Sequence, residues 1–408
     1  MKKLSLVAVA LLAGVLTAPA QPQVLKDAER ALKDGKTPAE VIAIITPAFS
    51  DPETSTLAQT YYIPGKAMFD EFDQLYALKQ FNKLPEGGAI AMGNDLLGGY
   101  DFYMQALPLD SVKNEKGKVK TKYSKDIINT IAGHYGDYNQ AAVDFWEAKQ
   151  YMNAYKAWDC FINIVENPTL AAKVANLPTD TVVGEIAFNQ ALAAWQADSL
   201  QLALNSFRFA QSKGYNKKSL YDYALAVAVS LGDDLTTFEV AKQGMEAYGS
   251  EDPTYIGYVI NYYLQNKQFE QAFAMVDEAI ASDPNNAQYY FIKGILYDNQ
   301  DKKAEAKAEF RKAIDMDPEN WQALLQYGRV LCEEAYALSD AAPTTAAEYE
   351  AYFNEKIVPL FKEAADYLEK SWNINSENPE ALRYLENIYY NLHDDAMMQD
   401  VENRKNNL

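Results

Sequence analysis

Residues that could carry out covalent chemistry are sparse in this chain of 408 residues. It has two histidines, His134 and His393, and two cysteines, Cys160 and Cys332. Neither histidine has a second His at metal-ligand spacing, and no two cysteines are separated by two residues. A Ser–His–Asp or Cys–His arrangement would need one of these histidines beside a nucleophile. The sequence therefore predicts no catalytic site, no metal site and no cofactor.

Carboxylates are abundant, but their positions indicate structural roles. Asp233-Asp234 and Asp394-Asp395 fall at expected turns between helices, where Asp is an ordinary capping residue. Pro64-Gly65-Lys66 has some likeness to a phosphate loop, but it lacks the other glycine and the following hydroxyl. We therefore expect a protein that is not an enzyme and whose chemistry is that of binding.

The elements that would position a binding surface are helical and recur along the chain. Small, aromatic and proline residues occur at fixed offsets between Asn286 and Asn320: Gly294, Tyr297, Ala306, Phe310, Ala313 and Pro318. The set Ala272, Val276, Ala279 and Pro284 precedes Ala306, Phe310, Ala313 and Pro318 by 34 residues at each position. Small residues allow two helices to cross closely, and proline ends the second helix because it has no backbone N–H. The pattern predicts repeated pairs of antiparallel helices.

This pattern resembles that of the tetratricopeptide repeat (TPR) family, whose period is about 34 residues. The resemblance implies an all-α, right-handed superhelical solenoid of TPR-like hairpins with a divergent helical N-terminal cap. We expect a signal peptide at 1–20, three divergent hairpins at 21–134 and a TPR solenoid of about seven repeats at 135–408. The predicted repeats are 135–168, 184–217, 218–252, 253–286, 287–320, 321–378 and 379–408.

Two prolines are expected to disturb helices. The repeat at 321–378 carries an insertion near 339–357, and its second helix, over 346–372, should kink at Pro359. In the cap, Pro64-Gly65 should bend or split a helix over 54–81.

The first residues have the parts of a secretory signal peptide. Lys2 and Lys3 precede an apolar run from Leu4 to Leu16, and Ala18-Pro19-Ala20 flanks the expected cut. The apolar run is too short to span a bilayer, and no other stretch reaches the roughly 18 apolar residues that a span needs. No cysteine lies near the cut. We expect cleavage near Ala20 and a periplasmic location without lipid anchor or membrane span, as in the exported TPR proteins of Gram-negative bacteria that the chain resembles.

The net charge argues against one class of partner, and the positions of the two cysteines argue against a disulfide. The chain has 37 basic and 57 acidic residues, a net charge of −20. An acidic surface repels phosphate backbones, so nucleic acid is not an expected partner. Cys160 and Cys332 fall in repeats separated by four others, which argues against a disulfide. We expect both to be small buried hydrophobic residues.

By the TPR resemblance, the first helices of the pairs line a concave groove that binds a peptide or helix of another protein. The residues expected to face this groove are Trp146, Phe188, Leu192, Trp195, Asn261, Gln265, Phe291, Ile295, Asn299, Leu325, Arg329, Arg383 and Asn387. The rings of Phe188, Trp195 and Phe291 would form an aromatic interaction surface, unless packing between repeats or the cap buries them. Arg383 and Asn387 have the spacing of a carboxylate clamp, but no basic residues follow on a next repeat, so that ligand is not expected.

The sequence thus predicts a non-catalytic scaffold of the cell envelope that binds a segment of another protein. The alternative is a glycan-binding or nutrient-uptake accessory protein, for which the 29 tyrosines would supply a platform. The missing lipoprotein cysteine and the missing long loops between repeats disfavour this alternative.

Overall fold

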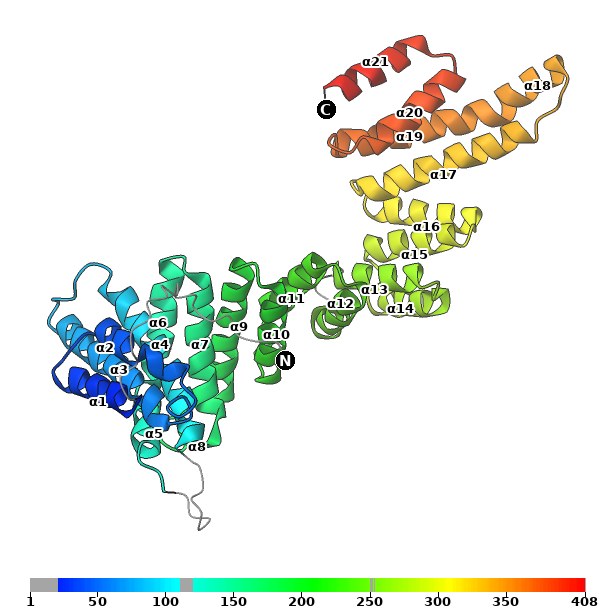
Figure 1. Ribbon diagram of the computed structural model, residues 1–408. Coiled ribbons are helices and arrows are strands. Elements are labelled where there is room, and N and C mark those ends of the chain that lie inside the picture. The colour runs from blue at the N-terminus through cyan, green and yellow to red at the C-terminus, as the bar shows by residue number, and fades with distance from the viewer. Residues whose placement is uncertain (1–20, 111–119, 250–251, 253, 408) are drawn as a thin grey trace. The chain divides into compact units, whose positions relative to one another are not determined.

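The computed structural model describes residues 21–110, 120–249, 252 and 254–407. The predicted signal peptide, at 1–20, lies outside this range. The described residues form helices joined by turns and contain no strand, which confirms the all-α prediction. They divide into two compact units, Met1–Leu231 and Gly232–Leu408 (Figure 1).

The first unit begins with the region predicted to be a cap. Its α-helices and one 3₁₀ turn, η1, are α1 (Gln21–Lys33), α2 (Pro38–Ile45), η1 (Thr46–Phe49), α3 (Ala58–Gln80), α4 (Gly88–Leu109), α5 (Ser124–Gly133), α6 (Tyr135–Glu147), α7 (Tyr151–Glu166), α8 (Pro168–Ala171), α9 (Asp180–Gln196), α10 (Leu200–Ser212) and α11 (Lys218–Leu231). Helix α1 packs against α2, α3 against α4, α6 against α7, α9 against α10, and α10 against α11.

The cap contains two hairpins and a single helix rather than three hairpins. Helix α5 packs against α4 and α8 and runs almost directly into α6 through His134. The ring of His134 lies against Phe69 and Phe72 of α3, with centroids 5.4 and 5.0 Å apart. This contact holds the α5–α6 junction on α3, so α5 extends the stack as a lone helix.

The second unit contains the predicted repeats from α12 onward. Its helices, with one π-helical turn η2, are α12 (Asp234–Tyr248), α13 (Thr254–Gln265), α14 (Phe269–Ser282), α15 (Ala287–Asn299), α16 (Lys303–Met316), α17 (Trp321–Asp340), α18 (Ala346–Tyr352), η2 (Phe353–Ile357), α19 (Val358–Ile374), α20 (Glu380–Asn391) and α21 (Asp395–Asn406). The boundary between the units falls inside the predicted repeat 218–252, between α11 and α12. Each of these helices packs within its own unit, α11 on α10 and α12 on α13.

One backbone turn recurs between paired helices. A residue with positive φ occupies the same place in each of these turns: Lys149, Asp198, Lys267, Asp301 and His393. After Asp301, the N–H of Lys302 donates to the carbonyl of Tyr297 at 3.0 Å. The N–H of Gln268 donates to the carbonyl of Tyr263 in the same way, at 2.7 Å. These bonds occupy carbonyls that the end of a helix leaves free, so the turn is one repeated structural unit.

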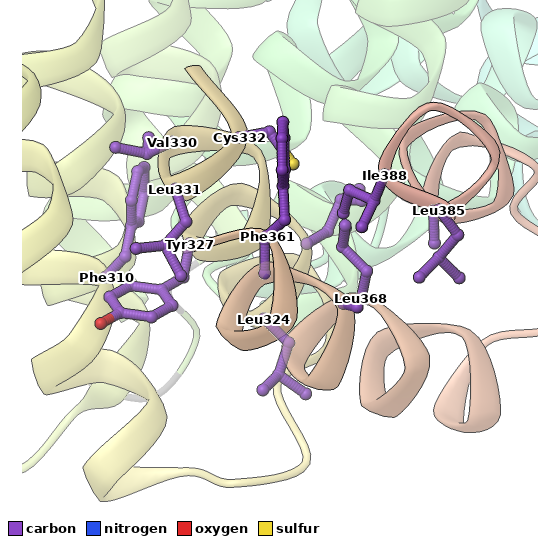
Figure 2. Close-up of a cluster of buried hydrophobic side chains, with 14 of the residues drawn as sticks. Phe310, Leu324, Tyr327, Val330, Leu331, Cys332, Phe361, Leu368, Leu385 and Ile388 are labelled. Atoms are coloured by element: carbon purple, nitrogen blue, oxygen red, sulfur yellow. The ribbon is translucent and has the colours of Figure 1, made fainter. Parts of the chain in front are cut away.

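Glycines mark the closest helix crossings of the second unit. A Cβ built on Gly294 of α15 would lie 2.5 Å from the ring of Phe310 on α16, which is fully buried. A Cβ on Gly328 of α17 would lie 2.7 Å from Leu368 of α19. Side chains from α16, α17, α19 and α20 then form one buried cluster, which includes Phe310, Leu331, Phe361, Leu368 and Leu385 (Figure 2).

The helices around the two prolines expected to cause irregularities, Pro64 and Pro359, differ in the structure. Helix α3 is continuous through Pro64, so a split at Pro64-Gly65 is wrong, whereas a bend there stays a prediction. Gly65 admits the ring of Tyr103 from α4 so closely that a Cβ would lie 2.4 Å from it, and this packing holds the helix together. The kink predicted at Pro359 stays a prediction, but the helix is irregular just before this proline. A π-helical turn precedes this proline, in which the N–H of Val358 donates to the carbonyl of Phe353.

Candidate functional site

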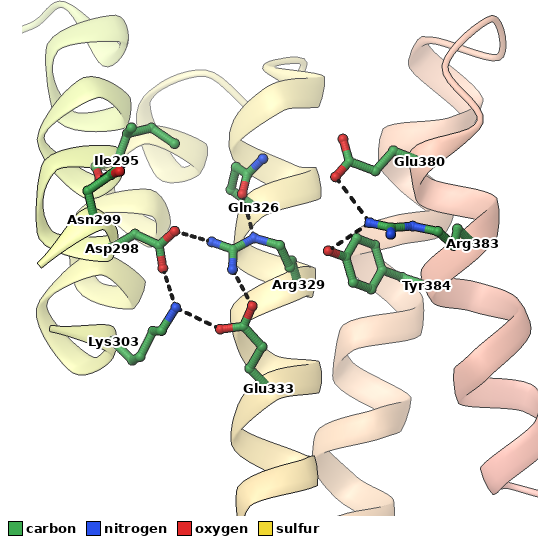
Figure 3. A network of polar contacts seen from close by, with 10 residues as sticks. All are labelled: Ile295, Asp298, Asn299, Lys303, Gln326, Arg329, Glu333, Glu380, Arg383 and Tyr384. Atoms are coloured by element: carbon green, nitrogen blue, oxygen red, sulfur yellow. Dashed lines mark hydrogen bonds and ion pairs between the residues drawn. The ribbon is translucent and has the colours of Figure 1, made fainter. Parts of the chain in front are cut away.

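The first helices of successive pairs in the second unit present polar side chains along one face (Figure 3). An ion pair joins two of these helices: Nη2 of Arg329 on α17 donates to Oδ2 of Asp298 on α15 at 2.5 Å. The Arg329 side chain is only 12 % exposed and the Asp298 side chain 17 %. A pair this well shielded from water fixes the spacing of the two helices more firmly than a surface pair would.

The same ion pair extends into a network across the face. Lys303 bridges Oδ1 of Asp298 at 2.7 Å and Oε2 of Glu333 at 2.8 Å. Arg329 also donates to Gln326 at 2.7 Å and to Glu333. Burial opposes the charge on Arg329, but the carboxylates of Asp298 and Glu333 raise its pKa above the ordinary value. The cations of this face are therefore already neutralised by the protein's own carboxylates.

Helix α20 continues the face with a more open cation. Arg383 is 63 % exposed and pairs with Glu380 at 3.6 Å. Its guanidinium also lies over the ring of Tyr384, 4.8 Å from the centroid, and donates to the Tyr384 hydroxyl at 3.2 Å. Asn387, one turn later, is exposed.

The predicted groove residues of the second unit differ in accessibility. Asn261 and Gln265 on α13 and Asn299 on α15 are exposed, and Ile295 is partly exposed. Phe291 is partly buried against Phe310, with ring centroids 5.9 Å apart. Leu325 is 3 % exposed within the buried cluster, so its side chain serves the core and cannot reach a ligand.

In the first unit, the predicted residues gather around rings that pack on one another. Phe188 is 8 % exposed and lies against Phe207, Tyr215 and Tyr223, so packing between helices buries it. Trp195 and Leu192 of α9 stay partly exposed, and Trp195 lies 5.6 Å from the ring of Tyr223.

Trp146 of α6 is also partly exposed, and it packs 5.2 Å from Tyr151 and 6.4 Å from Trp158. A shallow pocket lined in part by Tyr151, Met152 and Ala197 opens beside these helices.

The thiols are not poised for chemistry. Cys160 and Cys332 are both free and buried. Burial raises the pKa of the Cys332 thiol to about 12 and also raises that of Cys160. A thiol needs its thiolate form to react, so burial and a raised pKa both disfavour reaction at these two cysteines. No group of His, Cys, Asp and Glu side chains suited to a metal ion occurs in the part of the chain that the structure describes.

Sequence reasoning missed the acidic members of the polar face. Asp298, Glu333 and Glu380 are not among the predicted groove residues, although they hold Arg329, Lys303 and Arg383 in place. A usable signal was present, because two opposite charges lie on neighbouring first helices at nearly one repeat length. Asp298 and Arg329 are 31 residues apart.

A sequence profile of the tetratricopeptide repeat matches residues 287–320, the bounds of one predicted repeat. The chain carries a tetratricopeptide repeat. A curated relative of this chain is the Type IV pilus assembly protein PilF of Pseudomonas aeruginosa, 29% identical over 140 residues. The matched region covers 31% of this chain and 56% of that relative, so the chain spans little more than half of PilF.

Solved structures of TPR proteins are also similar. A MamA fragment of Desulfovibrio magneticus RS-1, running from residue 41 to its end, is 16% identical with a TM-score of 0.33, covering 48% of this chain and 96% of that one. The C-terminal part of a TPR repeat-containing protein of Cytophaga hutchinsonii is 14% identical with a TM-score of 0.40, covering 65% and 93%. Among the described residues, no helix combines the length and apolar character needed to cross a membrane.

Proposed function

We propose that this TPR protein is a non-catalytic scaffold that binds a segment of another protein on the face formed by α13, α15, α17 and α20. The repeat at 287–320 supports a role in protein–protein interaction, because stacked helical pairs create extended binding surfaces. The residues assigned to contact the partner are Asn261, Gln265, Ile295, Asn299, Arg329, Arg383 and Asn387. Phe188 and Leu325 are left out because they are buried.

The Arg329–Asp298 ion pair is the observation that carries this proposal. It aligns α15 and α17, and it leaves the exposed amide of Asn299 beside a row of fixed donors and acceptors. Rigid polar groups on a preformed surface can bind a peptide backbone at a lower entropic cost than mobile ones. The face suits a segment that offers hydrogen-bonding groups rather than a single strong charge.

We place the scaffold in the cell envelope, in the periplasm, on the basis of the signal-peptide pattern of the first residues. The name of the PilF relative, a pilus assembly protein, supports a role in assembling an envelope structure. Phe291 has a partly exposed side chain and would add an apolar contact to the partner segment. Trp146, Leu192 and Trp195 are partly exposed residues of the first unit and would contribute apolar contacts there.

Site-specific photocrosslinking tests the surface. A photoreactive amino acid would replace Asn299 or Asn387 on the proposed face, and Glu278 or Glu305 on the second helices α14 and α16 as matched exposed controls. We expect one discrete adduct, identified by mass spectrometry, from the first pair of positions only. Binding of the purified partner should then weaken by about tenfold in the variant N299A/N387A, because a few contacts dominate such interfaces.

Equal adducts from all four positions would refute the face as the binding surface. Cell fractionation tests the location. Finding the protein only outside the envelope fractions, with its signal peptide uncleaved, would refute the envelope location.

A further inference from the structure

A helix outside the repeat pattern lies at the end of the long hairpin of α17 and α19. Helix α18 follows the turn after α17, and none of its residues is buried. It continues without a break into the π-helical turn η2. In Figure 1, α18 and the last turns of α17 project past the ends of α16 and α20. Within the described part of the chain, no repeat helix packs extensively on α18.

Helix α18 and the turn η2 carry aromatic rings. Tyr349 is 39% exposed, and its ring stacks on Phe353 with centroids 5.9 Å apart. Phe353 and Tyr352 pack on the edge of the buried cluster of the second unit. The stack thus rests on a fixed base, and Tyr349 is its outer, accessible member.

Carboxylates flank the rings. Glu348 accepts a hydrogen bond from Thr345, Glu355 pairs with Lys356 at 3.0 Å, and Glu350 has no ion-pair partner among the described residues. The surrounding unit is strongly acidic. Residues 232–408 contain 33 Asp and Glu against 15 Lys and Arg, a net charge of −18, whereas residues 1–231 contain 24 against 22, a net charge of −2. Nearly all of the excess negative charge therefore belongs to the unit that carries α18.

We infer that α18 and η2 form a second docking surface, separate from the face proposed above, for a basic segment of a partner protein. Lys or Arg side chains of this segment would pair with Glu348 and Glu350, and one of them would lie over the ring of Tyr349. Cations favour the face of an aromatic ring and the neighbourhood of carboxylates, so both features select the same occupant. The field of the acidic unit would also speed the encounter.

Fluorescence anisotropy with two labelled helical peptides tests this docking surface on the full chain. One peptide contains Arg and Ala, and the matched peptide contains Glu in place of Arg. We expect the Arg peptide to bind at physiological ionic strength, where the Debye length is about 8 Å, and the Glu peptide not to bind. The variant Y349A should weaken binding about fivefold, whereas Y349F, which keeps the ring face, should bind as the wild type does.

Charge variants separate a local site from the general acidity of the unit. E348Q/E350Q should weaken binding of the Arg peptide by about fivefold. The matched variant E270Q/E278Q removes the same charge from exposed positions of α14 and should leave binding within about twofold. Circular dichroism would confirm that all variants keep their helical content.

Three results would overturn the inference. They are an equal loss in E270Q/E278Q, unchanged binding in Y349A, and no binding of the Arg peptide by the wild type. Sedimentation of the protein alone tests whether a second copy of this chain binds the surface instead. If the wild type dimerises and Y349A is monomeric, the surface binds a second copy of this chain and the inferred partner is wrong.

Discussion

At the scale of single residues, glycine allows two helices to approach closely because it has no side chain. Gly294 and Gly257 are both helical glycines, but their surroundings differ. A Cβ on Gly294 would meet the buried ring of Phe310, whereas a Cβ on Gly257 would meet nothing within 4 Å. The first glycine is required by packing and the second is not.

We expect opposite effects from the same substitution at these two positions. G257A should raise the free energy of unfolding by about 0.5–1 kcal/mol, because Ala favours the helix over Gly. G294A gains the same propensity but displaces Phe310, so it should lower that free energy by a net ~1–2 kcal/mol. Urea unfolding followed by circular dichroism measures both. A stabilising G294A would show that α15 and α16 do not cross as closely as described.

A second residue-scale feature is a carboxyl group that resists ionisation. Burial, together with the nearby charge of Glu71, raises the pKa of Asp95 on α4 to about 7. The folded state then holds a proton that the unfolded chain releases above pH 3.8, the ordinary pKa of Asp. The contribution of Asp95 to stability should therefore fall as pH rises from about 4 to about 7, and it should level off above that range.

D95N should remove this pH dependence. The variant and the wild type should have similar stability near pH 4, and D95N should be more stable at pH 8 by about 1 kcal/mol, after allowance for solvent screening. Urea midpoints at the two pH values measure the difference. E71Q serves as a partial control, because it removes the repelling charge but leaves the burial. Equal midpoint differences at both pH values would contradict the raised pKa.

At the scale of elements, the repeated left-handed turn shows how the chain reverses direction between paired helices. Its positive-φ positions hold residues other than glycine, such as Lys267, Asp301 and His393. A side chain in this conformation brings Cβ close to the backbone, which costs roughly 1 kcal/mol. The pattern of hydrogen bonds around the turn must outweigh this cost.

Substitution at Asp301 tests the turn. D301G should stabilise the protein by about 0.5–1 kcal/mol, because glycine adopts positive φ without steric cost. D301V should destabilise it by about 1–2 kcal/mol, because a β-branched residue fits this region worst. Differential scanning calorimetry of the two variants and the wild type shows which of the three is most stable. A D301V protein as stable as D301G would mean that the turn does not hold its left-handed conformation in solution.

The sequence predicted the helical pairs well because their signal is local. Small residues, rings and prolines at a constant interval indicate where helices cross and end, as at Gly294 and Pro318. Contacts between distant segments carry no such signal. Pro64 does not split α3 because Tyr103 packs on Gly65. Phe188 and Leu325 lie on the predicted face, yet neighbouring helices bury them. The helical period places a residue on a face without showing what covers it.

At the scale of the whole molecule, charge distinguishes the two units. Residues 232–408 carry a net charge of −18 and residues 1–231 a net charge of −2. Repulsion among like charges destabilises a compact state, and dissolved salt screens it. The second unit should therefore gain more from added salt than the first.

Hydrogen exchange resolved by mass spectrometry can follow both units in one sample of the intact chain. Raising sodium chloride from about 20 mM to about 0.3 M shortens the Debye length from about 20 Å to below 6 Å. We expect amide exchange in α13–α21 to slow by severalfold, and exchange in α3–α11 to change little. Equal slowing in both units would mean that local ion pairs, rather than net charge, set the response.

The π-helical turn before Pro359 has a consequence for how α18 is aimed. Such a turn holds one residue more than the corresponding α-helical turn. If residues 353–357 took up regular α-helical geometry with no deletion, α18 would rotate about its axis by roughly 100° relative to α19. Tyr349 would then point in a different direction although no contact of its own had been altered. The π-helical turn, by taking up one extra residue, thus determines the direction in which the stacked rings of Tyr349 and Phe353 face.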